Sequence, residues 1–485
     1  MLKKVLVALL ISTQFGLAPI KVVAEMENVC NDSLLISITN EESLKFKTYS
    51  KDDFGSEHII EIHDLTESYK EQVLNGEYSK LDAFNRVFSI MIDTSKTDIY
   101  DVKEQLEKNE IIKNVDYNNI NNVPTASIGT GINTNNQWLY DLIDLESAWS
   151  ITTGSSSVKV GIADTGIDIT NQYISSKVDT SLSRSFVDST EGALQDVYAH
   201  GTKVAGVVGA MYGTPSVQSG ICQNVTLVSL KIFANDNPGT DVDTAEAINY
   251  ANGNGIGILN VSIGSSSYNS TLEDAIENYS GLIVCSAGND SKDIDTNAYY
   301  LGRYTSSNIL CVGASTSIDT KGTDSNYGKT NVDLFAPGYG IYTTDTIANH
   351  ANGICKASQT SIAAPVVTGV AALIKSKYPN LTTSQIKYRI TANLEKVSAL
   401  SSYCVYGGRI NAYNALANNN HNHNGYTKYN LNQHYISCSC GYQGYENHTW
   451  VENSTGLSIE DSINGLVTGY KCKYCGETTI FDPYI

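Results

Sequence analysis

Short apolar runs alternate with amphipathic stretches through the middle of this 485-residue chain. Five runs are almost continuously apolar and rich in β-branched residues, as is typical of strands buried on both faces: VKVGIAD, LVSLKIF, GILNVSI, LIVCSAG and ILCVGAS. Between them, residues 241–255 and 270–281 carry helical patterns closed by glycine. This alternation predicts an α/β fold in three α/β/α layers, with a mostly parallel central sheet.

A long buried helix is predicted from residue 360 onward. Four apolar residues recur at a spacing of four: Ile362, Val366, Val370 and Ile374. Pro365 is tolerated because it falls near the first turn, where backbone donors lack partners. A second helix should follow, opened by Thr382 with Gln385 in capping-box spacing. Ser361 would then lie where helix amides and the helix dipole favour negative charge, a position that suits a nucleophile or a helix cap.

The amino-terminal part divides into two regions. Residues 1–24 place Lys3 and Lys4 ahead of a short apolar run that ends on Val-Val-Ala, which predicts a secretory signal peptide cleaved after Ala24, with a membrane anchor as the alternative. Residues 25–123 are polar and charged, with a strand pattern at 86–93 and a helical pattern at 98–112. They predict a small α+β domain that ends in an Asn-rich linker.

Composition narrows the class of protein. The chain carries 51 acidic and 32 basic residues, a formal net charge of −19, which disfavours nucleic acid as a partner. Beyond residue 24, no apolar stretch approaches the roughly 18 residues that cross a bilayer. The mature protein is therefore expected to be secreted, extracellular and without a transmembrane segment.

The carboxyl-terminal part is expected to be an Asn/His-rich linker, residues 418–433, and a small Cys-rich module, residues 434–485. Such a module is too small to rely on a core alone. Its two Cys pairs could bind one zinc ion, with His434 and His448 as alternative ligands, or form disulfides: Cys438, Cys440, Cys472 and Cys475. Both readings remain open. Cys285 and Cys311, by contrast, lie inside apolar runs and are interpreted as buried thiols.

A nucleophilic serine needs a base, and the base is best oriented by a buried carboxylate. Asp164 follows the first apolar run, at the end of a parallel strand where α/β proteins place their sites. His200 opens a short apolar helix, and only His350 joins it between residues 124 and 420. The sequence DTG, at residues 164–166, occurs once, which disfavours an aspartic peptidase because that chemistry needs a pair of carboxyl groups.

Four motifs together resemble the subtilisin-like (subtilase, S8-type) serine peptidases in order and spacing: ADTGID at 163–168, HGTKVAG at 200–206, SAGND at 286–290 and QTSIAAP at 359–365. The resemblance extends from about Asn135 to about Ala417 and implies a subtilisin-like peptidase domain over residues 124–417. It implies a secreted serine endopeptidase, a hydrolase that cuts peptide bonds through an acyl-enzyme. The alternative is a catalytically inactive relative that serves as a binding protein at the cell surface.

The resemblance also implies residue roles. Ser361 would be the nucleophile, His200 the general base, Asp164 the group that orients His200, and Asn289 a side-chain donor to the oxyanion. Two positions depart from the family pattern. Gln359 stands where glycine is usual, and Lys203 stands where histidine is frequent.

Substrate contacts are carried over from the family in the same way. An extended polypeptide would pair as an added strand with Ser262, Ile263 and Gly264. The first side-chain pocket would be lined by small residues that leave room for a large apolar side chain: Gly264, Ser286, Ala287, Gly288 and Gly302. Asp290 at its rim could instead admit a basic side chain.

The family resemblance further implies a zymogen. Residues 25–123 would form a propeptide that inhibits the cleft, and the enzyme would cut its own linker between Tyr117 and Asn135. No cofactor is required for the chemistry, and calcium in the peptidase domain is expected from the resemblance alone. A monomer is expected.

Overall fold

The computed structural model describes residues 29–75, 84–121, 127–128, 135–211, 219–235 and 237–417, followed by six short strands between residues 426 and 481. The predicted signal peptide lies outside the described residues, as do Cys438, Cys440, Cys475 and most of the linker predicted at 418–433, of which residues 426–428 and 433 are described as strand. For Cys472, the structure describes the backbone, which lies in a strand, but not the side chain. Within these residues, no helix combines the length and apolar character needed to cross a membrane.

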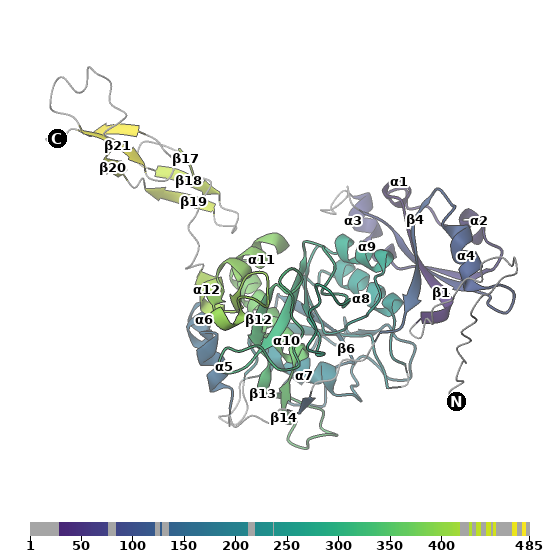
Figure 1. Ribbon diagram of the computed structural model, residues 1–485, viewed down its shortest axis with the longest axis horizontal. Helices are drawn as coiled ribbons and strands as arrows, with labels where there is room; N and C mark the ends of the chain where they lie inside the picture. Colours follow the sequence, from purple (N-terminus) through teal and green to yellow (C-terminus); the bar gives the residue numbers. More distant parts are fainter. Residues whose placement is uncertain are drawn as a thin grey trace, which may run out of the picture.

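A nine-stranded sheet forms the centre of the molecule (Figure 1). Its strand order is β15-β16-β12-β11-β10-β9-β6-β8-β7, and every pairing is parallel except that of β15 with β16. The strands are β6 Lys159–Asp164, β7 Arg184–Ser185, β8 Thr226–Lys231, β9 Ile258–Val261, β10 Leu282–Ser286, β11 Ile309–Ser315, β12 Leu334–Pro337, β15 Glu395–Lys396 and β16 Gly408–Arg409. The five strands predicted from apolar runs are all present.

Helices cover both faces of this sheet. The helices are α5 Gln137–Leu142, α6 Leu145–Ile151, α7 His200–Gly209, α8 Asp241–Gly253, α9 Ser270–Asn278, α10 Thr360–Lys377, α11 Thr383–Ala392 and α12 Ala412–Ala417. Side chains of α7 and α10 share one apolar core with Val284, whereas those of α8 and α9 share another with the next residue, Cys285. Because successive strand residues point to opposite faces, the predicted three-layer α/β/α arrangement is confirmed.

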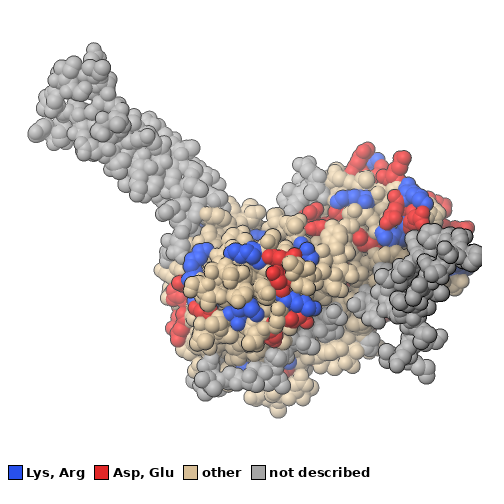
Figure 2. Space-filling model, viewed as in Figure 1, with Lys and Arg blue, Asp and Glu red and all other residues tan. Residues whose placement is uncertain are grey.

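A smaller antiparallel sheet packs beside the central domain. Its strand order is β2-β3-β1-β4, from β1 Val29–Ile38, β2 Ile59–Asp64, β3 Val87–Ile92 and β4 Ile112–Asn119. Its helices are α1 Asn40–Ser43, α2 Lys51–Phe54, α3 Lys70–Leu74 and α4 Ile99–Leu106. We call residues 29–119 the N-terminal module. Figure 2 shows red and blue side chains interspersed on its surface, in line with its charged sequence.

The helix predicted at 98–112 is shorter in the structure. It ends at Leu106, and Ile112 already begins β4. Asn109 causes the break, because its side-chain oxygen accepts a hydrogen bond from the backbone of Ile111 at 3.1 Å and closes a turn. The Asn-rich stretch expected to be linker is likewise a paired strand as far as Asn119.

The N-terminal module contacts the central domain through the amino-terminal ends of α8 and α9, beside which it lies in Figure 1. The Asp116 carboxylate accepts hydrogen bonds from the backbone and hydroxyl of Thr271 at 2.7 and 2.6 Å. Asn118 accepts one from the backbone of Val242 at 3.1 Å. These β4 side chains satisfy helix donors that would otherwise need water.

Two further groups of strands complete the described chain. β5 Ser127–Ile128, β13 Tyr339–Thr344 and β14 Ile354–Ser358 form one antiparallel sheet. The remaining strands form two three-stranded antiparallel sheets, from β17 Tyr426–Lys428, β18 Gln433–Ser437 and β19 Gln443–Asn447, and from β20 Trp450–Glu452, β21 Thr468–Cys472 and β22 Thr478–Phe481.

At Gly206, α7 approaches β13 closely. A Cβ atom there would lie 2.1 Å from the Thr344 hydroxyl and 2.7 Å from the Thr344 backbone nitrogen. We predict that Gly206→Ala lowers the free energy of unfolding by about 1–3 kcal/mol, because the helix must move away from the strand. Denaturant unfolding measures this loss. Gly257→Ala is the matched control, since nothing lies within 4 Å of its added Cβ; equal effects in the two variants would contradict the prediction.

Candidate active site

The structure brings Asp164 and His200 together. Asp164 is the last residue of β6 and His200 the first residue of α7. The His200 Nδ1 atom lies 2.7 Å from Asp164 Oδ1, and both side chains are almost completely buried. A carboxylate in this place fixes the orientation of the imidazole ring and favours the tautomer with hydrogen on Nδ1.

Two glycines allow the strand end and the helix start to meet. A Cβ atom on Gly201 would lie 2.2 Å from the Gly166 carbonyl oxygen and 3.1 Å from Asp164 Cβ. Gly166 has a φ of 108°, and its own Cβ would lie 2.2 Å from the Gln195 carbonyl oxygen. The close approach therefore depends on the absence of side chains at both positions.

Asp196 holds the two segments in register. Its Oδ1 atom accepts from the Thr165 hydroxyl at 2.7 Å and from the Ala199 backbone at 2.8 Å, and its Oδ2 accepts from the Thr202 backbone and hydroxyl at 2.7 and 2.6 Å. Burial raises the pKa of Asp196, and the hydrogen bonds from Thr202 and Thr165 oppose that rise. One buried carboxylate thus ties the residue after Asp164 to residues on both sides of His200.

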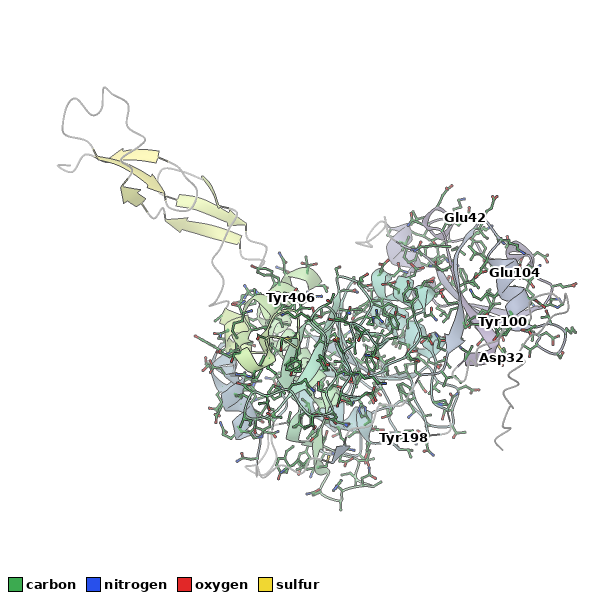
Figure 3. All side chains as sticks on the ribbon, viewed as in Figure 1. Asp32, Glu42, Tyr100, Glu104, Tyr198 and Tyr406 are labelled. Carbon is green, nitrogen blue, oxygen red and sulfur yellow. The ribbon has the colours of Figure 1, made fainter. Side chains whose placement is uncertain are left out.

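The loop that leads into His200 has both buried and exposed side chains. Asp196 is buried, whereas Val197 and Tyr198 are 57% and 41% exposed. Tyr198 lies at the surface in Figure 3. The loop therefore presents apolar side chains to solvent next to His200.

Ser361 occupies the first turn of α10, as predicted, and α10 packs against α7. Several buried side-chain atoms of the described residues have no hydrogen-bond partner, and three of them belong to this site: Asp164 Oδ2, His200 Nε2 and Ser361 Oγ. Buried polar atoms without partners are uncommon and require an explanation, of which a catalytic role is one. Hydrogen bonds between catalytic groups are often long or misaligned before substrate binds.

Asn289 is oriented by the residue next to Ser361. Its Oδ1 atom accepts from the Thr360 backbone at 3.0 Å and from the Thr360 hydroxyl at 2.7 Å. This leaves Nδ2 as the donating end of the amide. A side-chain donor fixed beside the start of α10 is suited to stabilise negative charge that develops near Ser361.

The loop that carries Asn289 rests on Asn326, which is buried. The Asn326 side chain donates to the Ala287 carbonyl at 2.9 Å and accepts from the backbones of Asp290 and Lys292 at 3.0 and 2.8 Å. Its backbone nitrogen also donates to the Gly288 carbonyl at 2.8 Å. Asn326 therefore fixes the loop on both sides of Asn289.

The two departures from the family pattern each have a local partner. Gln359 adopts a φ of 95°, a conformation that favours glycine, and its side chain donates to Asp324 at 2.7 Å. The Lys203 ammonium group lies 3.7 Å from the buried Asp345 carboxylate. Both departures therefore leave Asp164 and His200 themselves unchanged.

The predicted pocket residues gather around an aromatic ring that the prediction did not include. A Cβ on Gly264 would lie 2.2 Å from Tyr299 Cζ, and one on Gly288 would lie 2.6 Å from Tyr299 Cε2. The Tyr299 hydroxyl lies near the Ser286 side chain. Gly302 faces the Cys311 sulfur, at 2.8 Å from an added Cβ. The space expected for a large apolar side chain is therefore occupied by Tyr299.

Sequence reasoning missed Asp196, Tyr299 and Asn326. Asp196 had a signal, because an Asp shortly before a predicted helix often accepts hydrogen bonds from its first turn. Tyr299 lies three residues before Gly302, so its bulk beside the expected pocket was visible in the sequence. Asn326 carried no pattern, since its partners are 34 to 39 residues distant along the chain.

Comparison with known proteins agrees with this geometry. The sequence profile of the subtilase family, Peptidase S8, matches residues 155–426. The thermophilic serine proteinase of Bacillus sp. (strain AK1) is 34% identical over 272 residues, which cover 56% of this chain and 64% of that protein. Thermitase of Thermoactinomyces vulgaris is 31% identical over 278 residues, 56% of this chain and 93% of that protein.

A solved structure shares the fold. The crystal structure of a lanthipeptide protease matches with a TM-score of 0.50 and 22% identity, over 58% of this chain and 94% of that one. At this identity the likeness concerns the fold alone. The family match covers more than half of the chain, so the protein belongs to the subtilase family of serine endopeptidases.

Proposed function

We propose that Ser361, His200 and Asp164 form the catalytic triad of this endopeptidase, with Asn289 as an oxyanion donor. The observation that carries the proposal is the 2.7 Å contact between His200 and Asp164, in a buried site beside the helix whose second residue is Ser361. The unpartnered Ser361 Oγ and His200 Nε2 atoms support it further. A nucleophile, a base and an orienting carboxylate are the groups that acyl transfer requires.

The proposed reaction has two halves. The Ser361 oxygen attacks the carbonyl carbon of the peptide bond while His200 Nε2 takes its proton, and Asn289 with the Ser361 backbone amide stabilises the oxyanion. The C–N bond breaks as His200 gives the proton to the leaving amine. Water then attacks the resulting ester while His200 takes its proton; the bond between the acyl carbon and Ser361 Oγ breaks, His200 returns the proton to Oγ, and the acid product leaves. Asp164 stabilises the imidazolium in both halves.

The N-terminal module is proposed to be an inhibitory propeptide that the enzyme removes itself. Beyond β4, Ile120 forms an antiparallel bridge with Thr240, and the Asn121 backbone donates to the Gly239 carbonyl at 3.0 Å. Chain leaving the module therefore adds to the peptidase domain as a strand does, which is how an extended substrate is recognised. Further along, Ser127–Ile128 pairs with β14, three residues before Ser361.

Extracellular function is part of the same proposal. It is supported by the signal-peptide pattern at residues 1–24. Substrates would be extended polypeptides, and the enzyme would act as a monomer. The catalytically inactive binding protein remains the second reading, but the unpartnered atoms of Ser361 and His200 favour catalysis.

Metal ions would have structural roles only, since subtilases need no cofactor for the chemistry. The described residues contain no group of three or more His, Cys, Asp or Glu side chains placed to hold a metal, and we assign no ligands to the calcium expected from the family. The cysteines of the Cys-rich module could bind zinc or form disulfides, and both alternatives concern side chains that lie outside the described part of the structure.

Asn289→Leu tests the oxyanion role. We predict that kcat falls about 100–1,000-fold with KM nearly unchanged, a magnitude known for loss of such a donor in subtilisin itself. Steady-state kinetics on a peptide substrate measures this, and an unchanged melting temperature shows that the fold is kept. A change confined to KM would assign Asn289 to substrate binding instead.

Ser361→Ala tests self-processing. We predict that the purified variant keeps its N-terminal module covalently attached after refolding, whereas the wild-type chain is cut between Tyr117 and Asn135. Mass spectrometry of the two refolding reactions gives the answer. Maturation of the variant to the wild-type size, without added protease, would contradict the prediction.

Asp196→Asn tests the positioning of His200. The amide would place a donor opposite the Thr202 backbone donor, so we predict a fall in kcat of about 100-fold with KM retained, as expected for a displaced catalytic group. Asp141→Asn, at an exposed site, is the control. A purely structural role would lower the melting temperature and the fraction of active enzyme but leave kcat per active site unchanged.

A further inference from the structure

Tyr299 lies between the two backbone segments that should grip the substrate side chain next to the cut bond. One segment is Ser262–Gly264, which follows β9, and the other is Ser286–Gly288, at the end of β10. Cβ atoms added to Gly264 and Gly288 would lie 2.2–2.4 Å and 2.6–2.7 Å from atoms of the Tyr299 ring and hydroxyl. The same edge of one ring therefore contacts both segments.

Contacts on several sides hold the Tyr299 ring in this place. The ring is partly buried and packs against the apolar core that includes Cys285, and its hydroxyl lies near the Ser286 side chain. Its backbone is fixed by the next residue, because Tyr300 and Ser265 exchange two backbone hydrogen bonds of 2.7 and 2.9 Å.

The position of this ring limits what can enter. An aromatic or long branched side chain placed between Gly264 and Gly288 would overlap Tyr299 and would have to displace it from both segments. A methyl group, a hydroxymethyl group or a hydrogen needs much less space. Protein interiors resist added volume because they are already densely packed.

We propose that Tyr299 is the specificity-determining residue of this peptidase and restricts cleavage to bonds that follow a small residue, namely glycine, alanine or serine. This inference rests on the proposed function, since it takes Ser361 as the attacking group and Asn289 as the oxyanion donor. It replaces the expectation of a large apolar side chain. The linker that the enzyme is proposed to cut contains such residues, Ala126 and Ser127.

The test compares matched peptide substrates that differ only at the residue before the cut bond, with alanine or phenylalanine there. For the wild-type full-length enzyme after maturation, we expect kcat/KM for the alanine peptide to exceed that for the phenylalanine peptide by at least about 100-fold. In Tyr299→Gly, kcat/KM for the phenylalanine peptide should rise, so that the kcat/KM values of the two peptides differ by no more than about tenfold.

Two controls separate the ring from other effects. Tyr299→Phe keeps the ring and loses only the hydroxyl, so it should retain the preference for alanine even if the glycine variant does not fold. Tyr406→Ala removes a surface tyrosine on α12's side of the molecule, labelled in Figure 3, and should leave the preference unchanged. Ser361→Ala is run in parallel to attribute the cleavage.

The outcomes are distinguishable. A wild-type enzyme that cuts after phenylalanine as readily as after alanine would overturn the role of Tyr299 but not that of Ser361. Full cleavage by Ser361→Ala would instead overturn the proposed nucleophile. A mature amino terminus that follows a large residue of the linker, found by sequencing, would also contradict the inference about Tyr299.

Discussion

The hydrogen bond between His200 and Asp164 is the interaction on which the site depends. It joins the end of a central strand to the start of a helix on one face of the sheet, so both residues must be held by their own elements before they can meet. Gly166 and Gly201 provide the close approach, and Asp196 supplies four hydrogen bonds that tie the two segments together. The network uses a buried carboxylate, which is costly to bury unless its oxygens are satisfied.

The turn that precedes Ser361 holds a strained backbone conformation. Gln359 holds a φ of 95°, where a side chain costs about 1–3 kcal/mol. Its backbone donates to Gly338 and its side chain to Asp324, and these bonds offset part of that cost. This conformation lets the Thr360 backbone donate a hydrogen bond to Asn289 and places Ser361 in the first turn of α10. Glycine, which the sequence comparison with the family expects here, would reach the same turn without strain.

Much of the fold was predictable because it follows from local pattern. Continuous apolar runs identified five of the parallel strands, β6 and β8 to β11, and the capping box at Thr382 correctly started α11. Asp164, His200 and Ser361 were found through motifs whose chemistry demands those residue types. Two expectations missed different features: the local turn at Asn109 ended α4 early, and Tyr299 lies against Gly264 and Gly288, in space that small residues seemed to leave open. The spacing of residues along the sequence could not show that the Tyr299 ring would lie between Gly264 and Gly288.

The central claim is that Ser361 is a nucleophile activated by His200. The most direct measurement is reaction of the mature enzyme with a fluorophosphonate, followed by peptide mapping of the adduct by mass spectrometry. We predict one adduct, on Ser361, formed far more slowly in His200→Ala. An adduct on another residue, or equal rates of labelling in the wild-type enzyme and His200→Ala, would contradict it.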